Sequence, residues 1–156
     1  MNNIEFTIFP SAFDTKVKPE NQYSVPWDKL AKKLQTPTIV SKKEDAKLLV
    51  PASFNTNGKR NSDDLITYSA LCLDVDDNYH PLVFIQQDFP DLEYVVYSSF
   101  NHNLNKKTQE VDKSIHKFRV VVPLKEAITV EQLRTGKDAL MKTFPGVDPA
   151  SFTPSQ

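Results

Sequence analysis

One short stretch limits the fold more than any other: an apolar run that ends abruptly in three carboxylates. Residues 68–73 are apolar and bounded by polar residues, a pattern that predicts a buried β-strand. Asp74, Val75, Asp76 and Asp77 follow at once. Because side chains alternate across a strand, we expect Asp74 and Asp76 on the same side, with Asp77 as a cap or turn residue.

Two carboxylates this close repel each other unless a cation lies between them or one takes up a proton. Mg²⁺ is a hard cation that one or two carboxylates hold together with water and phosphate oxygens. The pair Asp74 and Asp76 therefore predicts a divalent-metal site. The alternative is a strand that enters a turn, where aspartates are common. The local pattern leaves these two interpretations level.

Composition narrows the class of protein. The chain has 156 residues with 39% hydrophobic and 25% charged content, which fits one globular domain with a proper core. A net charge of −1 gives no global basic field, so nucleic-acid binding would need a local basic patch. No apolar run approaches the roughly 18 residues of a membrane span, and the N-terminus lacks the pattern of a signal peptide. The single cysteine, Cys72, cannot form an internal disulfide. These features favour the cytoplasm and no membrane partner.

Strands and helices alternate along the chain. This order predicts an α+β (α/β-like) fold with a mixed, largely antiparallel β-sheet flanked by helices. The expected strands are residues 4–9, 68–73, 94–98 and 117–122, and Pro123 ends the last of them. Three helices are expected: one that begins at Ser24–Pro26, one over residues 81–88, and one from a Thr129 cap to about Phe144. Residues 10–25, 51–62 and 101–114 are expected to be irregular or loops.

Further candidate site residues lie at strand ends. Asp148 is either a third metal ligand or a turn aspartate before proline. His102, with Ser99 nearby, follows a strand end, where a His could donate to a phosphate oxygen; His80 and His116 lack that setting and are expected at the surface. Arg119 is embedded in an apolar strand and needs either a salt bridge to an aspartate or a phosphate.

The last group of candidate site residues carries positive charge. Two basic pairs stand in predicted loops, and they are candidates for contacts to a nucleic-acid backbone if the metal site is real. The alternative is that they merely solvate the surface. The residues are Lys59, Arg60, Lys106 and Lys107.

In order, these pieces resemble the archaeo-eukaryotic primase superfamily. Residues 73–76 are similar to its first motif, an apolar strand followed by Asp-x-Asp, and residues 98–102 to its second, a strand end leading to His. Residues 147–148 resemble its third motif. The strand at 117–124 follows the His as in plasmid- and phage-borne primases and primase-polymerases. The resemblance is firm over 65–156 and weak before.

The resemblance implies a DNA-replication primase or primase-polymerase, a nucleotidyltransferase that makes short primers on single-stranded DNA. Two Mg²⁺ or Mn²⁺ ions would be held by Asp74, Asp76 and Asp148. Nucleoside triphosphates would be bound by Ser99, His102 and Arg119. A helicase or replication protein would be a further partner, and a bacterium, phage or plasmid the source.

Two departures keep other interpretations open. The segment between the His and the Arg strand is longer than the family leads us to expect, and the chain stops where related proteins continue. We therefore expect residues 1–156 to be a single primase-like domain truncated at its C-terminus, with an N-terminal part (1–62) and a motif-bearing core (63–156). The alternatives are an inactive primase-like module that binds nucleotide, DNA or a protein partner, and a small metal-dependent nuclease.

Overall fold

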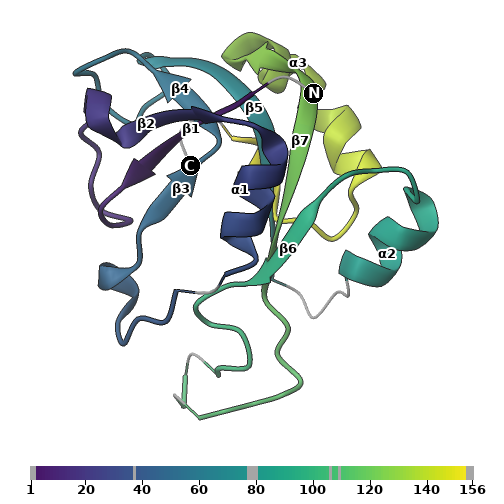
Figure 1. Cartoon of the computed structure of the whole chain (residues 1–156). Helices are drawn as coiled ribbons and strands as arrows, with labels where there is room; N and C mark the ends of the chain where they lie inside the picture. The colour runs from purple at the N-terminus through teal and green to yellow at the C-terminus, as the bar shows by residue number, and fades with distance from the viewer. Residues whose placement is uncertain (1–2, 37, 77–80, 106, 109, 154–156) are drawn as a thin grey trace.

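The structure, a computed structural model, describes residues 3–36, 38–76, 81–105, 107–108 and 110–153. Within these ranges, two antiparallel sheets and three α-helices make up a mixed α+β fold (Figure 1). This confirms the predicted fold class. Asp77, His80 and Lys106 lie outside the described residues.

The first sheet has the strand order β2-β1-β3. β1 (Ile4–Phe9) lies in the middle as predicted, between β2 (Gln22–Val25) and β3 (Leu48–Val50). The prediction of irregular structure over 10–25 is therefore wrong for its last four residues. The short, half-polar run of β2 carries little strand signal of its own, and its pairing with β1 determines its conformation.

The second sheet has the order β4-β5-β7-β6, and every neighbouring pair is antiparallel. It contains β4 (Ala52–Phe54), β5 (Leu65–Val75), β6 (Val95–Ser98) and β7 (Phe118–Thr129). β4 falls in a stretch predicted to be a polar loop. That prediction is wrong because Ala52 and Phe54 are buried against the core, a property of the tertiary fold.

Strand β7 does not stop at Pro123, where the sequence predicts its end. Pro123 pairs with Ala70 next to an irregularity in register between Tyr68 and Ala70. Proline has no backbone N–H to donate to the ladder, so a bulge is one of the few places in a sheet that accepts it. The irregularity lets the strand continue to Thr129.

The three helices are α1 (Trp27–Leu34), α2 (Pro81–Asp88) and α3 (Val130–Thr143). α1 begins one residue later than predicted, with Pro26 at the cap position. At the start of α3 the predicted capping box is confirmed. The Thr129 hydroxyl accepts the Gln132 N–H at 3.2 Å, and the Gln132 side chain accepts the Thr129 N–H at 2.8 Å.

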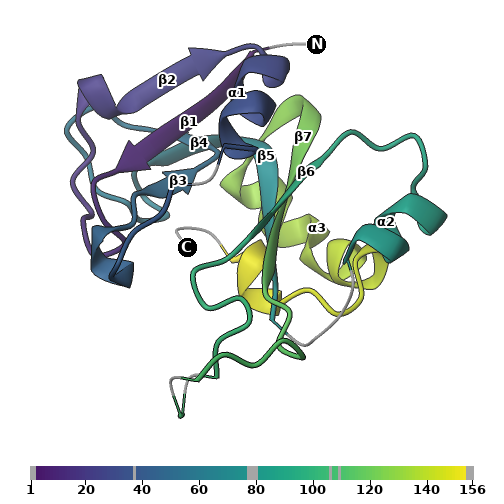
Figure 2. The ribbon, with the colours of Figure 1, turned by 60° about the horizontal axis from the view of Figure 1, so that its bottom comes forward.

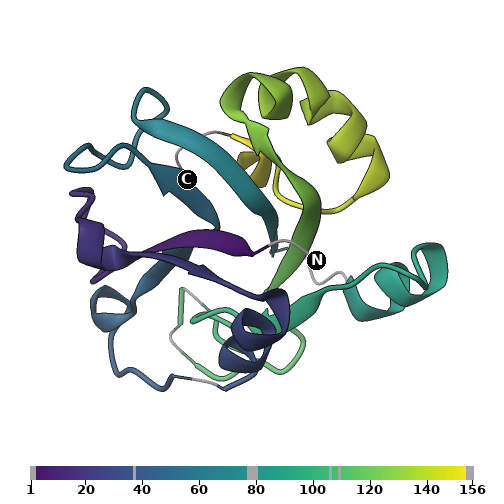
Figure 3. The ribbon, with the colours of Figure 1, turned by 45° about the horizontal axis from the view of Figure 1, so that its top comes forward.

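The second sheet lies between two layers (Figures 2 and 3). One of its faces packs on α3 and on the short 3-10 helix η3 (Pro149–Phe152), around buried side chains such as Leu73, Val120, Leu133 and Phe152. The opposite face packs on α1 and β1 through a smaller apolar cluster that includes Trp27. Side chains of alternating parity on β5 and β7 therefore enter two different environments.

Candidate functional site

A row of three polar side chains crosses the second sheet. Asp74 on β5 pairs with Arg119 on β7, and Arg119 pairs with Tyr97 on β6, so the three residues are direct neighbours in register. Arg119 Nε donates to Asp74 Oδ1 at 2.7 Å, and the positive charge of Arg119 acts on the neighbouring Tyr97 hydroxyl. The structure thus gives Arg119 the aspartate partner that the sequence offered as one of two alternatives.

Burial changes the pKa values of the groups in and beside this row. Burial raises the pKa of the Cys72 thiol to about 11, an effect that Arg119 partly opposes. Burial likewise raises the pKa of Tyr97 above its usual value. For Arg119, burial lowers the pKa, but the adjoining Asp74 carboxylate raises it and the net change is upward. The row therefore consists of a cation, its carboxylate and the neutral Tyr97 hydroxyl, with the neutral Cys72 thiol beside it.

A second ion pair lies beside the first. Lys117 Nζ lies 3.3 Å from Asp76 Oδ1, and the Asp76 side chain is 47% exposed. Lys117 immediately precedes β7 and Asp76 immediately follows β5, each two residues from Arg119 or Asp74, and the two ion pairs agree with all four side chains lying on one face of the sheet. The predicted parity of Asp74 and Asp76 agrees with this arrangement. A divalent ion between the two carboxylates would have to displace both cations.

Asp148 reaches β5 through its backbone. Its N–H donates to the Asp74 carbonyl at 2.8 Å, while its carboxylate accepts the Ala150 N–H at 2.8 Å and caps η3. Ser151 completes the attachment because its hydroxyl accepts the Asp74 N–H at 2.8 Å. Among the described residues, no group of three or more His, Cys, Asp or Glu side chains is arranged to hold a metal ion. The two Mg²⁺ or Mn²⁺ ions stay a prediction.

A small pocket of about 110 Å³ opens beside the ion pair, between β3, β5, β7 and η3. This volume is below the roughly 300 Å³ at which small-molecule sites begin. Sequence reasoning missed two of its hydroxyl-bearing residues, Ser151 and Thr153, because nothing in a Pro-Ala-Ser-Phe-Thr run indicates contact with a strand so distant in the chain. The polar lining comes from Asp74, Arg119, Ser151 and Thr153, with Cys72 beside them.

The residues predicted to bind nucleotide fall into two separate neighbourhoods. Ser99 donates its N–H to the Lys117 carbonyl at 2.9 Å, and the Lys117 N–H donates to His102 Nδ1 at 3.1 Å. The His102 ring also packs against Phe118, with centroids 4.7 Å apart. Phe118 and Arg119 are consecutive strand residues and face opposite sides of the sheet. His102 therefore belongs to the Phe118 side and Arg119 to the Asp74 side.

The basic residues predicted to contact a nucleic-acid backbone also differ in their surroundings. Lys59 and Lys107 are exposed. Arg60 instead turns inward: its Nη2 donates to the Ala12 carbonyl at 2.9 Å, and the guanidinium lies 5.4 Å from the centroid of the Phe9 ring. Burial lowers the pKa of Arg60, although Asp14 partly offsets this. The Arg60 side chain thus holds a loop of the protein in place.

Charge is distributed very unevenly along the chain. Residues 16–60 contain ten Lys or Arg and four Asp or Glu, a net charge of +6, and the other residues contain nine and sixteen, a net charge of −7. The overall charge of −1 conceals this asymmetry, which is why composition alone gave no basic field. A strongly basic segment in a neutral chain points to an anionic partner.

Comparison with known proteins decides the family. The sequence model of the type II intron maturase family matches residues 19–153. The chain belongs to the type II intron maturase family. Searches of curated proteins and of solved structures found no match. No helix in the described part of the chain is long and apolar enough to cross a membrane.

This membership corrects the resemblance to primases. The maturase match extends over most of the chain, whereas the primase resemblance rested on motifs of a few residues each. The predicted primase or polymerase activity, the role in DNA replication and the single-stranded DNA template are wrong for a maturase-family chain. The structure supplies a physical reason for the false similarity: Asp74 and Asp76 each form an ion pair with a residue at or beside β7, and Asp148 caps η3.

Proposed function

We propose that this chain binds intron RNA and acts in its splicing. Membership of the type II intron maturase family supports the identity of the partner. The structural observation that carries the proposal is the basic segment, residues 16–60, with its net charge of +6. Phosphate contacts supply most of the affinity of proteins for nucleic acids, and a local excess of lysine is the feature they require.

The lysines of this segment are available to a partner. All nine are exposed, and the ion pairs within the described residues, Lys117–Asp76 and Arg119–Asp74, involve none of them. They are distributed over the approach to β2, the outer side of α1, the turn before β3 and the loop after β4. The residues are Lys16, Lys18, Lys29, Lys32, Lys33, Lys42, Lys43, Lys47 and Lys59.

Two of these lysines are held side by side. Lys16 and Lys59 are opposite each other in an antiparallel bridge, flanked by hydrogen bonds from Val17 N–H to the Gly58 carbonyl and from Arg60 N–H to the Thr15 carbonyl. This pattern is that of a non-hydrogen-bonded pair, in which side chains come closest. Like charges directly opposite destabilise the pairing. A bound phosphate would relieve that repulsion, so the pair favours an anionic ligand.

The decisive experiment measures the affinity of the chain for a group II intron RNA and for duplex DNA of the same sequence over a range of salt concentrations. We expect tighter binding to the RNA, with log K falling as log salt rises. The double variant Lys16→Gln/Lys59→Gln should reduce the salt slope by about 0.7 to 0.9 for each phosphate that the protein no longer neutralises.

The matched control is Lys125→Gln/Lys142→Gln, which removes two exposed lysines outside the basic segment. We expect the control to bind intron RNA as the unaltered chain does. An equal drop in affinity in the two double variants, or an affinity for DNA as high as for intron RNA, would overturn the proposal. A splicing assay with the same RNA then tests whether the bound protein raises the splicing rate.

A further inference from the structure

A cluster of three aromatic rings lies where β7 begins. His102, His116 and Phe118, which we call the ring cluster, have centroids 4.7 to 6.1 Å apart, and the rings of His116 and Phe118 are nearly parallel at 5°. All three side chains are half-buried, so each keeps an accessible part. Sequence reasoning treated His116 as an ordinary surface residue and His102 as a phosphate ligand. The structure joins them into one aromatic surface.

The surrounding loop holds the ring cluster in a fixed arrangement. His102 Nδ1 accepts the Lys117 N–H at 3.1 Å, which orients the His102 ring. Further along the loop, the Asn103 N–H donates to the Ile115 carbonyl and the Asp112 N–H to the Asn103 carbonyl, both at 2.9 Å. These bonds tie residues 101–105 to residues 110–117, and we call the described residues of this loop the hairpin. Rings that are already fixed in position before a ligand binds lose little conformational entropy when the ligand stacks on them.

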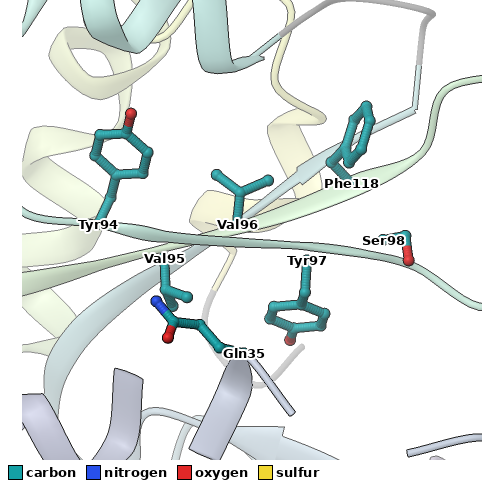
Figure 4. Close-up of a pocket in the computed structure, with 7 residues that line it drawn as sticks. All are labelled: Gln35, Tyr94, Val95, Val96, Tyr97, Ser98 and Phe118. Atoms are coloured by element: carbon teal, nitrogen blue, oxygen red, sulfur yellow. The ribbon is translucent and has the colours of Figure 1, made fainter. Parts of the chain in front are cut away.

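Phe118 connects the ring cluster to a groove along β6. The groove has a volume of about 480 Å³, within the usual range for a small-molecule site of roughly 300 to 1,000 Å³. β6 is the edge strand of its sheet. Figure 4 shows Tyr94, Val96 and Phe118 pointing to one side of β6, and Val95 and Tyr97 to the other. Rings and apolar groups therefore continue along one side of the strand, from Tyr94 to Phe118.

The chemistry around the rings selects an anionic partner with flat, aromatic groups. The loop that leads to the rings carries exposed Lys107 and Lys113 and another exposed ring, Phe100, which is 42% exposed. Figures 1 and 3 place this hairpin at the same end of the molecule as the segment between α1 and β3, which carries Lys42, Lys43 and Lys47. Rings next to lysines are the surface that binds single-stranded nucleic acid, because unpaired bases expose π-faces and the backbone is anionic.

We infer that the ring cluster and the β6 groove stack unpaired bases of a single-stranded segment of the RNA. The inference rests on the proposed function and deepens it. The lysines of the basic segment hold phosphates of any RNA, and the rings distinguish an unpaired segment from a duplex, whose bases are stacked on one another. The inference predicts that the chain prefers loops or junctions of the intron RNA over its helices.

The test compares an oligoadenylate of about 12 nucleotides with an abasic strand of the same length and charge, which has phosphates but no bases. Affinities are measured by fluorescence anisotropy. We expect the unaltered chain to bind the oligoadenylate about tenfold or more tightly than the abasic strand. Phe118→Leu and His116→Gln should each reduce this preference and leave affinity for the abasic strand unchanged.

The charge variant Lys16→Gln/Lys59→Gln is the matched control and should lower both affinities by the same factor. Thermal unfolding checks that each variant is folded, and if Phe118→Leu unfolds, His116→Gln alone decides. A preference for bases that persists in the folded ring variants, or no preference in the unaltered chain, overturns the inference. Absence of binding to intron RNA and to the abasic strand would instead refute the proposed function.

Discussion

The Asp74–Arg119 pair gives the most direct test of the site, because its two interpretations predict opposite changes in folding stability when the Asp74 charge is removed. Asp74→Asn removes the negative charge and keeps the shape of the side chain. If the carboxylate acts mainly as the partner of Arg119, the substitution destabilises the fold. If Asp74 and Asp76 are held together for a metal ion, their mutual repulsion is relieved and the fold gains stability.

The distance and exposure of the ion pair set the expected loss of unfolding free energy in Asp74→Asn. The Nε–Oδ1 distance is 2.7 Å, and the side chains of Arg119 and Asp74 are 33% and 38% exposed. Exposed pairs contribute about 0.2 to 1 kcal/mol, and breaking a buried pair costs about 3 to 5 kcal/mol. A pair of intermediate exposure, in which a neutral acceptor remains, lies between these limits. We expect Asp74→Asn to lower the free energy of unfolding by about 1.5 kcal/mol.

The assay is urea unfolding followed by the fluorescence of Trp27. This is the single tryptophan of the chain, and it is 8% exposed in the apolar cluster that Cys72 and Tyr97 pack against. Asp76→Asn is the matched control: its pair with Lys117 is longer, at 3.3 Å, and its own side chain is 47% exposed, so we expect a loss of about 0.5 kcal/mol.

An equal or smaller loss for Asp74→Asn than for Asp76→Asn would refute the argument from distance and burial. A gain in stability would show that repulsion between the carboxylates outweighs the pairing, and it would favour the metal-site prediction. Adding Mn²⁺ to the unaltered chain and to Arg119→Gln extends the test. A carboxylate released from Arg119 should bind the ion more tightly, and this is measured as a rise in unfolding temperature.

Three other expectations follow from the fold. Phe152→Ala should lower the free energy of unfolding by about 3 to 4 kcal/mol in urea unfolding, since the side chain of Phe152, the last residue of η3, is fully buried in the main core. Phe13→Ala, at a side chain 73% exposed, is the control and should change it by under about 0.5 kcal/mol. Thr129→Ala should cost about 1 kcal/mol in the same assay because it removes the side-chain half of the capping box of α3. Finally, burial raises the pKa of Cys72 from 9.0 to about 11. The folded state therefore favours the thiol, and the stability it contributes is complete below pH 9 and is lost as the pH rises towards 11. Unfolding titrations should show a smaller loss over this range for Cys72→Ala, and an identical loss would count against the burial of the thiol.

Short-range patterns were sufficient for much of the fold. The alternation of Ile4–Phe9, the apolar run before Asp74 and the capping box at Thr129 each lead to the element that the structure contains, because each depends on neighbours within one turn or one strand. The parity of Asp74 and Asp76 is of the same kind. Their shared face follows from the period of a strand, whatever the rest of the chain does.

The partners of these side chains were decided by the tertiary structure. Pairing of β5 with β7 brings Arg119 to Asp74, 45 residues away, and η3 brings Ser151 to Asp74 across 77 residues. Strand β4 and the ring cluster likewise depend on tertiary contacts, which form only when distant parts of the chain come together. Short motifs cannot show such partners, and this is why an Asp-x-Asp strand end led to the resemblance to primases. The sequence by itself determined which side chains share a face, and the tertiary structure determined what each face meets, because register and packing join residues that no local pattern connects.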